Sequence, residues 1–359
     1  MLRSSYLKAL ELASPDNISM YYIGVFKSEE LAGIALVEHV RVYVKDMFQK
    51  KSSSPTKTFL RDAISRFLKG NILVLGNLTH TGQHGLCFLD GEITLEAYLD
   101  AVFKSIEEIE REIKNKFGKR IKLLLLKDYF VDDQAHELRC LFQAKQFSSV
   151  SVQPNMVMAV ESKWIKMEDY VNNLNTKYRT RYKRARKKFG NFEKRELNEN
   201  AIESHSNKLH ELYANVSDNA KFNTFFLPEH HFLSLKKELR ENFKVFGYFH
   251  GDNIIGFYTL ILNQSVLETY FLGYDSEYQH SNQLYLNMLY DMLDFAITNK
   301  FESVVYARTA MEIKSSVGAE PKEMVMYIKH TTPFANSILR YIFNFMKPNQ
   351  KWEKRHPFK

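Results

Sequence analysis

Eight basic residues stand between positions 177 and 188, and no acidic residue interrupts them. Such a run has the chemistry to bind phosphates, because guanidinium and ammonium groups are common partners of phosphate oxygens. Two interpretations are open. The run binds phosphates, either of a cofactor pyrophosphate or of a nucleic-acid backbone, or it is the solvated face of a long helix. We favour the first, because a purely solvated helix usually mixes charges to gain ion pairs. The residues are Lys177, Arg179, Arg181, Lys183, Arg184, Arg186, Lys187 and Lys188.

This run accounts for the net charge of the whole protein. The chain of 359 residues has 50 Lys and Arg against 42 Asp and Glu, a formal net charge of +8. Without the eight residues of the run, 42 basic residues balance 42 acidic ones. A negatively charged partner is therefore expected to bind at this run alone. The protein lacks the general basicity of a chromatin or ribosomal protein.

The basic run is predicted to lie on a helix that follows Glu168 and Asp169 and ends at Gly190. Apolar residues recur there at steps of three and four, which is the helical period. One face of this helix therefore packs while the other is cationic. The periodic residues are Val171, Leu174, Tyr178, Tyr182, Ala185 and Phe189.

Length and composition predict a packed cytoplasmic protein of two domains. A single core rarely grows beyond about 250 to 300 residues, and 27 Phe with 20 Tyr argue against disorder. Only Cys87 and Cys140 are present, without metal-ligand spacing, which suits a reducing compartment. No window has the length of apolar sequence that a membrane helix needs, and the first residues lack a signal core.

The second half of the chain alternates strands and helices. Gly251, Asp252 and Asn253 separate two β-rich runs and predict a hairpin. Ser281 or Asn282 is expected to cap the helix that follows the third strand. The predicted elements are a strand at 156–160, the basic helix, helices at 209–216 and 228–241, strands at 245–250, 254–262 and 266–274, a helix to about 296, a strand at 303–308, a helix at 312–317 and a strand at 323–330.

Three stretches of this half resemble the GNAT superfamily, and in particular its FemAB-like and BioF2-like acetyltransferases. The resemblance covers about residues 156 to 330. The stretches are Tyr170-Val-Asn-Asn-Leu-Asn-Thr-Lys-Tyr-Arg-Thr-Arg-Tyr-Lys-Arg-Ala185, Leu272-Gly-Tyr-Asp275 with Glu277-Tyr278, and Arg308-Thr-Ala310 with Lys314 and Gly318-Ala319.

The first half is predicted to repeat the same architecture in degenerate form, as the resemblance to tandem GNAT proteins implies. The fold class is therefore α/β with mixed sheets, in an N-terminal GNAT-like domain at 1–155 and a C-terminal one at 156–359. Residues 50–57 form a turn-rich insertion. The predicted elements are a hairpin at 20–26 and 32–44, strands at 71–77, 121–129 and 148–152, and helices at 95–117 and 133–146.

A glycine-rich segment, 76–85, follows a strand of the first half and contains His80 and His84. Its glycines and polar groups suit either a ligand cleft or a tight surface loop. The two histidines lie four residues apart without the Glu of the HExxH motif, so no metal site is expected.

The resemblance implies acyl or aminoacyl transfer from an activated thioester or ester to an amine. It places Glu268 and Asp275 on and after the strand that faces the scissile carbonyl, as candidate bases, with Tyr278 to protonate the leaving group. Tyr274 and Tyr285 are the candidate substrate contacts. The alternatives are that Glu268 faces solvent, that Asp275 is a helix cap, and that the tyrosines belong to the core.

The resemblance also implies a site for the donor's phosphates or carboxylate. GNAT enzymes that use coenzyme A commonly have a glycine-rich loop where this chain has residues 276–283 without glycine. An aminoacyl-tRNA or acyl carrier protein therefore remains as an alternative donor to acyl-CoA. The candidate cofactor-binding residues are Arg179, Lys183, Arg186, Lys187, Arg308 and Lys314.

A different class of function remains open: a non-enzymatic module that binds RNA or another polyanion through residues 177–188. The C-terminal stretch 337–346 is apolar at helical spacing and precedes a basic tail, 351–359. We expect a docked helix with a loose tail there. The oligomeric state is not predicted.

Overall fold

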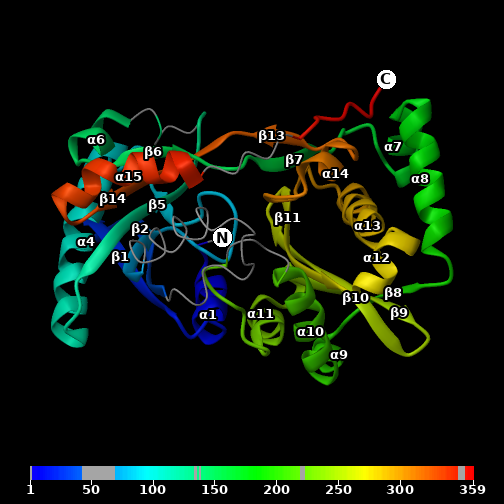
Figure 1. The fold of residues 1–359 in the computed structure, drawn as a ribbon, viewed down its shortest axis with the longest axis horizontal. Helices are drawn as coiled ribbons and strands as arrows, with labels where there is room; N and C mark the ends of the chain where they lie inside the picture. Colours follow the sequence, from blue (N-terminus) through cyan, green and yellow to red (C-terminus); the bar gives the residue numbers. More distant parts are fainter. Residues whose placement is uncertain (1, 43–68, 133–135, 137–138, 219–222, 347–351) are drawn as a thin grey trace, which may run out of the picture.

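Two mixed β-sheets with helices packed against them make up the protein (Figure 1). The computed structural model describes residues 2–42, 69–132, 136, 139–218, 223–346 and 352–359. The predicted insertion at 50–57 lies outside the described residues. The two mixed sheets confirm the expected α/β fold class.

The first sheet has the strand order β1-β2-β3-β5-β14-β6, and β4 pairs with β2. Helix α4 packs against it, capped at its start by the Thr94 side chain and ended by Gly118 in the left-handed conformation. The strands are β1 (Ile18–Lys27), β2 (Glu30–Val42), β3 (Gly70–Leu75), β4 (Leu86–Phe88), β5 (Ile121–Phe130), β6 (Ser148–Ser151) and β14 (Met324–His330). The helices are α4 (Leu95–Phe117), α6 (Arg139–Ala144) and α15 (Pro333–Met346).

The second sheet has the order β13-β7-β12-β11-β10-β9-β8. The predicted hairpin is confirmed, because β9 and β10 pair antiparallel around the turn at Gly251. The strands are β7 (Asn155–Ala159), β8 (Glu193–Glu196), β9 (Phe243–His250), β10 (Asn253–Asn263), β11 (Val266–Tyr274), β12 (Ser303–Val305) and β13 (Glu320–Lys322).

Helices cover both faces of the second sheet, with one apolar core on each side. On one face α10 crosses β11 so closely that a side chain at Gly273 would meet the backbone of Leu212. This contact explains the glycine of the Leu272-Gly-Tyr-Asp stretch. One face carries α7 (Met167–Asn173), α8 (Thr176–Phe189), α12 (Ser276–Asn282), α13 (Leu284–Thr298) and α14 (Met311–Ser315); the other carries α1 (Ser4–Leu12), α9 (Glu199–Ser204), α10 (Ser206–Ser217), α11 (His231–Leu239) and the 3-10 turn Arg240–Asn242.

Two segments cross between the halves. Strand β14 comes from the second half of the chain but pairs with β5 and β6 in the first sheet. Helix α1 comes from the first half but packs against α11 beside the second sheet. The halves are therefore interlocked, and the division into domains at residue 155 stays a prediction.

The predicted basic helix is two helices, which corrects the expectation of one. Helix α7 ends before Leu174, whose backbone is extended, and α8 begins after Asn175. The Asn175 side chain accepts a hydrogen bond from the Tyr178 amide at 3.3 Å, which is a typical helix N-cap. The apolar spacing continued across the break, so periodicity alone did not reveal it.

The C-terminal residues 352–359 are docked and not loose as expected. Phe358 pairs with Leu174 at the break between α7 and α8, and the Asn175 amide donates to the carbonyl of Pro357 at 2.9 Å. The Phe358 ring occupies the space that a side chain at Gly318 would need. The end of the chain therefore holds the start of the basic helix against α14.

Candidate functional site

The parallel strands β11 and β12 separate after a short pairing, and a pocket lies where they part. They pair at only three positions, and the last is Glu268 opposite Val305. A pocket of about 170 Å³ then opens between β11 and the loop that follows β12. Ligands of α/β proteins commonly bind at the carboxyl ends of parallel strands, so this fork is the candidate site. It is lined by Leu78, Thr79, His80, Thr81, Phe225, Thr269, Tyr270, Phe271, Ala307 and Arg308.

The loop on the β12 side of the fork is strained. Ala307, Thr309 and Ala310 all have left-handed backbones, which residues with a side chain rarely adopt. The Lys314 Nζ donates to the carbonyl of Ala307 at 3.1 Å and to that of Arg308 at 2.7 Å. Lys314 is buried, and burial lowers its pKa to about 7. Lys314 therefore holds the fork loop through these two hydrogen bonds, and its role in donor binding stays a prediction.

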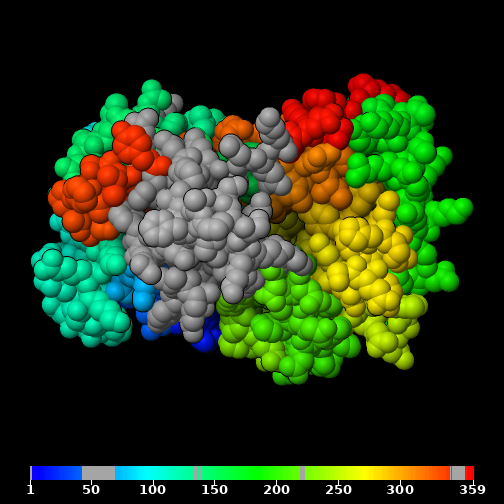
Figure 2. Space-filling view, in the orientation of Figure 1, coloured from blue at the N-terminus to red at the C-terminus, as the bar shows by residue number. Residues whose placement is uncertain are grey.

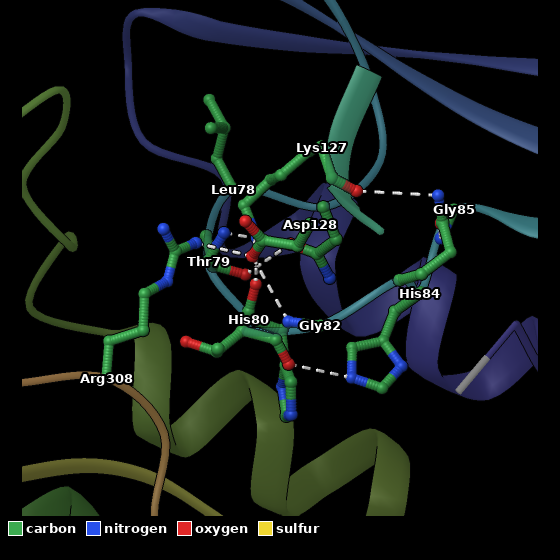
Figure 3. A network of polar contacts seen from close by, with 12 residues as sticks. Leu78, Thr79, His80, Gly82, His84, Gly85, Lys127, Asp128 and Arg308 are labelled. Atoms are coloured by element: carbon green, nitrogen blue, oxygen red, sulfur yellow. Dashed lines mark hydrogen bonds and ion pairs between the residues drawn. The ribbon is translucent and has the colours of Figure 1, made fainter. Parts of the chain in front are cut away.

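Arg308 projects from this loop across to the first half, where it pairs with the buried carboxylate of Asp128 (Figure 3). Lys127 pairs with the same carboxylate and donates to the His80 carbonyl at 2.5 Å, while the Gly82 amide donates to Asp128 at 3.2 Å. Burial raises the pKa of Asp128, but Lys127 and Arg308 outweigh it, so that the pKa lies below its ordinary value. Burial lowers the pKa of Lys127.

Sequence reasoning missed Lys127 and Asp128. The available signal was that two charged residues directly follow the apolar run Leu123–Leu126. Four residues of the glycine-rich segment 76–85, Leu78 to Thr81, line the pocket, as the interpretation of a cleft requires; ligand binding by this segment stays a prediction.

Glu268 lies behind the pocket wall and is buried between two histidines of the first half. Its Oε2 is 3.4 Å from His80 Nε2 and its Oε1 is 4.0 Å from His84 Nε2. The interpretation in which Glu268 faces solvent is therefore wrong. Burial raises the pKa of Glu268, but the hydrogen bond from His80 and both imidazoles lower it below its ordinary value. Burial lowers the pKa of His84 to about 3.

Aromatic packing fixes the His80 ring. It stacks on Tyr270, with ring centroids 5.4 Å apart, and its Nδ1 is 3.4 Å from the Tyr6 hydroxyl. Tyr270 in turn contacts His231, whose Nε2 is 3.1 Å from the tyrosine hydroxyl. His80 is thus held by residues of α1 and β11 as well as by its own loop.

Asp275 and Tyr278 lie at the opposite end of β11 from Glu268. Seven residues of extended strand span roughly 23 Å, so the three predicted catalytic residues cannot act on one carbonyl. Asp275 is the N-cap of α12, where its side chain accepts from the Glu277 amide at 3.0 Å. Tyr278 packs edge-on against Phe192 and His250. The cap interpretation of Asp275 is confirmed, and the predicted trio is not brought together.

Tyr274 and Tyr285 lie beside each other on the α13 face of the second sheet, with ring centroids 6.2 Å apart. Both pack against the core, and burial raises the pKa of each hydroxyl. Neither lines the fork pocket. Their predicted role as substrate contacts stays a prediction.

The region 276–283, where a glycine-rich loop was absent from the sequence, forms helix α12. The Gln279 side chain accepts a hydrogen bond from the Tyr285 amide at 2.8 Å, in the first turn of α13. The caps expected at Ser281 and Asn282 are wrong, because Asn282 instead donates to the Lys188 carbonyl. One amide at the start of α13 thus already has a partner, where a pyrophosphate would need free amides.

Seven of the eight basic residues of α8 divide into two groups, and the eighth, Arg181, is half-buried. Arg186 turns inward to Asp291, at 2.8 Å, and the Arg179 side chain donates to the Leu174 carbonyl at 2.9 Å. The exposed basic residues lie on the outer face of α8, which forms one rim of the molecule, green at the right of Figure 2. They are Lys177, Lys183, Arg184, Lys187 and Lys188.

Comparisons with known proteins confirm the resemblance. Residues 176–315 match the family model described as an acetyltransferase (GNAT) domain. Similar solved structures include FemX (11% identity, 90% of each chain covered, TM-score 0.54) and a tandem GNAT protein from the clavulanic acid biosynthesis pathway (9% identity, 92% of this chain and 89% of that chain covered, TM-score 0.50). L-PGS from Bacillus licheniformis is also similar (8% identity, 95% of each chain covered, TM-score 0.51).

The chain has the fold of FemX and of the tandem GNAT protein, and a large part of its second half matches the model of the GNAT acetyltransferase domain. No curated protein matches the sequence. Within the part of the chain that the structure describes, no helix has the length and apolar character to cross a membrane.

Proposed function

We propose that the protein is an N-acyltransferase that brings an activated acyl or aminoacyl group and an amine acceptor together at the fork between β11 and β12. The observation that carries this proposal is the pocket at the fork, which is lined on one side by residues of the matched GNAT region and on the other by the loop at residues 78–81. Holding two reactants in one small site lowers the barrier by orienting them before reaction. The neutral amine attacks the acyl carbonyl, a C–N bond forms, and the thioester or ester bond breaks; the donor leaves as the thiol or alcohol, which takes up the proton that the amine nitrogen loses.

Each residue at the fork has a distinct role in this proposal. Lys314 and Arg308 are positioning residues: Lys314 holds the strained loop, and Arg308 ties that loop to Asp128. Of the predicted catalytic residues we retain Glu268 alone, as a positioning residue for His80, which lines the pocket. Asp275 and Tyr278 lie too far from the fork to act there.

The donor is proposed to approach over the outer face of α8. Lys183 and Lys187 are exposed there and suit a phosphate-bearing donor, whereas Arg186 is bound to Asp291. The partnered start of α13 favours an aminoacyl-tRNA or acyl carrier protein over acyl-CoA. All three donors remain within the proposal, and the experiment below separates them.

The test measures thermal unfolding of the purified chain with acetyl-CoA, longer acyl-CoAs, acyl carrier protein and aminoacyl-tRNA. A donor at 100 times its Kd should add about 2.7 kcal/mol of stability. Thr269→Trp fills the fork pocket and should abolish this response, while the exposed Thr332→Trp should keep it. Mass spectrometry then detects acylated amines. No stabilisation by any donor together with no acylated product would contradict the proposal.

A second candidate function rests on the exposed cations of α8: a module that binds RNA or another polyanion without catalysis. Such binding weakens steeply with salt, because each neutralised phosphate releases counterions. The double change Arg184→Glu and Lys187→Glu should abolish it, and the same reversal at Lys8 and Lys27 on the first half should not. Binding that is insensitive to salt would exclude this candidate.

A further inference from the structure

The two histidines of the glycine-rich loop and Glu268 of β11 form a compact cluster between the halves of the molecule. One ligand atom from each of His80, His84 and Glu268 lies within 4.8 Å of the other two. The side chains are 3%, 16% and 5% exposed, respectively. We propose that this cluster binds a divalent first-row transition-metal ion, with Zn²⁺ the first choice.

The donor set suits zinc. Two imidazoles and one carboxylate form one of the recurrent zinc-binding combinations in proteins. Ligand atoms about 2.0 to 2.1 Å from a tetrahedral zinc ion lie about 3.3 Å from one another. The His80 Nε2 to Glu268 Oε2 separation of 3.4 Å agrees with this. His84 Nε2 is 4.0 Å from the other oxygen, Oε1, and the three ligand atoms lie within 4.8 Å of one another, so the side chains must move closer together to bind one ion.

The same separations are too long for a tight ion pair between histidine and glutamate. Charge-assisted hydrogen bonds between an imidazolium and a carboxylate are about 2.7 to 2.9 Å long. The remaining contact of the carboxylate, from the Asn263 amide, is also long, at 3.4 Å. A buried carboxylate is costly unless it is closely paired, and a cation centred among the three side chains would supply that pairing.

The surroundings both support the site and set one requirement. His80 Nδ1, the ring nitrogen that faces away from Glu268, lies within hydrogen-bond distance of the Tyr6 hydroxyl. Metal-bound imidazoles commonly have such a hydrogen-bond partner on the nitrogen that does not bind the metal. His84 Nε2 lies 3.0 Å from the Thr81 carbonyl, so metal binding must replace that hydrogen bond. Lys127 lies nearby, and its charge is held by Asp128.

The cluster takes ligands from both halves, so metal binding would tie the loop after β3 to strand β11. Among the described residues the cluster has three side-chain ligands. A tetrahedral ion would therefore keep one position for water or for a ligand that enters the pocket beside His80. The inference rests on this geometry and does not require that the protein transfer acyl groups.

The experiment uses the untagged full-length chain with Cys87→Ser and Cys140→Ser, because both thiols are exposed and would bind metal adventitiously. Metal is removed with a chelator, and Zn²⁺ binding is measured by calorimetry and by metal analysis after dialysis. Glu268→Gln and His84→Gln are the test variants, and the exposed His230→Gln is the matched control. Circular dichroism and unfolding of each metal-free variant show whether it is folded.

Three results together would support the site. The parent protein binds one equivalent of Zn²⁺, which raises its unfolding temperature. His230→Gln binds Zn²⁺ equally well, and both test variants bind it at least tenfold more weakly. Co²⁺ should give the visible absorption of a tetrahedral ion in the parent protein and in His230→Gln, but not in the two test variants. Absence of stoichiometric binding, or binding equally tight in folded Glu268→Gln, would overturn the inference. If an acyl donor stabilises the metal-free protein, the proposed acyl transfer remains supported even when no metal binds. Failure of the metal site can therefore be distinguished from failure of the proposed function.

Discussion

The guanidinium of Arg308, in the second half of the chain, pairs with the buried carboxylate of Asp128 in the first half. This contact connects the strained loop of the fork to the end of β5, beside the loop that lines the pocket (Figure 3). Asp128 keeps Lys127 and the Gly82 amide as further partners. The geometry of the fork is thus set from both halves.

We predict that Arg308→Met lowers the free energy of unfolding by about 2 kcal/mol, because it leaves a buried carboxylate with one cationic partner fewer. A double-mutant cycle with Asp128→Asn should show a coupling energy of roughly 1 to 2 kcal/mol in urea denaturation. Additivity of the two changes to within about 0.5 kcal/mol would show that the pair does not couple the halves.

Glu38 is predicted to make stability depend on pH. It is buried, its Oε2 accepts from the Leu78 amide at 2.9 Å, and burial raises its pKa to about 7. The folded state therefore binds the proton more tightly, and stability falls as pH rises from about 4.5 to about 7. Glu38→Gln should remove this loss, worth about 3 kcal/mol at pH 8.

The measurement for Glu38 is urea denaturation at pH 5 and pH 8, with the exposed Glu30→Gln as the control. The difference between wild type and Glu38→Gln should appear at pH 8 and be small at pH 5. An equal difference at both values would show that ionisation of Glu38 is not its cause.

Lys314 is predicted to have the opposite dependence. Its pKa is about 7 in the folded state, against 10.5 for an exposed lysine, so the unfolded chain binds the additional proton between these values. Stability should therefore rise with pH from about 7, by up to about 1.4 kcal/mol per unit. Lys314→Met should lack this slope, while the exposed Lys322→Met should keep it in unfolding measured at pH 7 and pH 9. Parallel slopes in both variants would exclude Lys314 as the source.

Two arginines of the same helix should behave differently. Arg186→Met breaks the contacts with Asp291 and Asn287 and should cost about 2 kcal/mol of folding free energy. Arg184→Met changes an exposed side chain and should stay within about 0.5 kcal/mol. Equal losses in chemical denaturation would contradict the division of α8 into an inner and an outer group.

Asp275 should act as a cap and not as a base. Asp275→Ala should cost about 1 kcal/mol, and Asp275→Asn and Asp275→Ser should restore most of it, because both residues cap helices well. The Asn variant keeps the cap without a carboxylate, so it should retain the donor response and any acyl transfer. Loss of turnover in a stable Asp275→Asn protein would show that the Asp275 carboxylate takes part in catalysis.

The regular elements of both halves followed from local patterns. Strand β11 and helix α4 have the predicted bounds, 266–274 and 95–117, because alternation and helical spacing report burial directly. The break at Leu174 was not predicted, since it depends on the Asn175 cap and on the docking of Phe358 from the far end of the chain. Helix α1 was not predicted either, and its apolar face is completed by α11.

By itself the sequence determined the fold class, the hairpin, the cationic helix and the resemblance to GNAT acyltransferases, because each depends on residues close together in the chain. Only the tertiary structure decided which of the candidate residues meet. Glu268 lies on β11 and Asp275 directly follows the same strand, yet their surroundings differ. Glu268 and His80, in contrast, are 188 residues apart in the sequence, and their side-chain oxygen and nitrogen are 3.4 Å apart. The physical reason is that the site forms where strands separate and two halves close, and no local pattern records a contact between segments so distant in sequence.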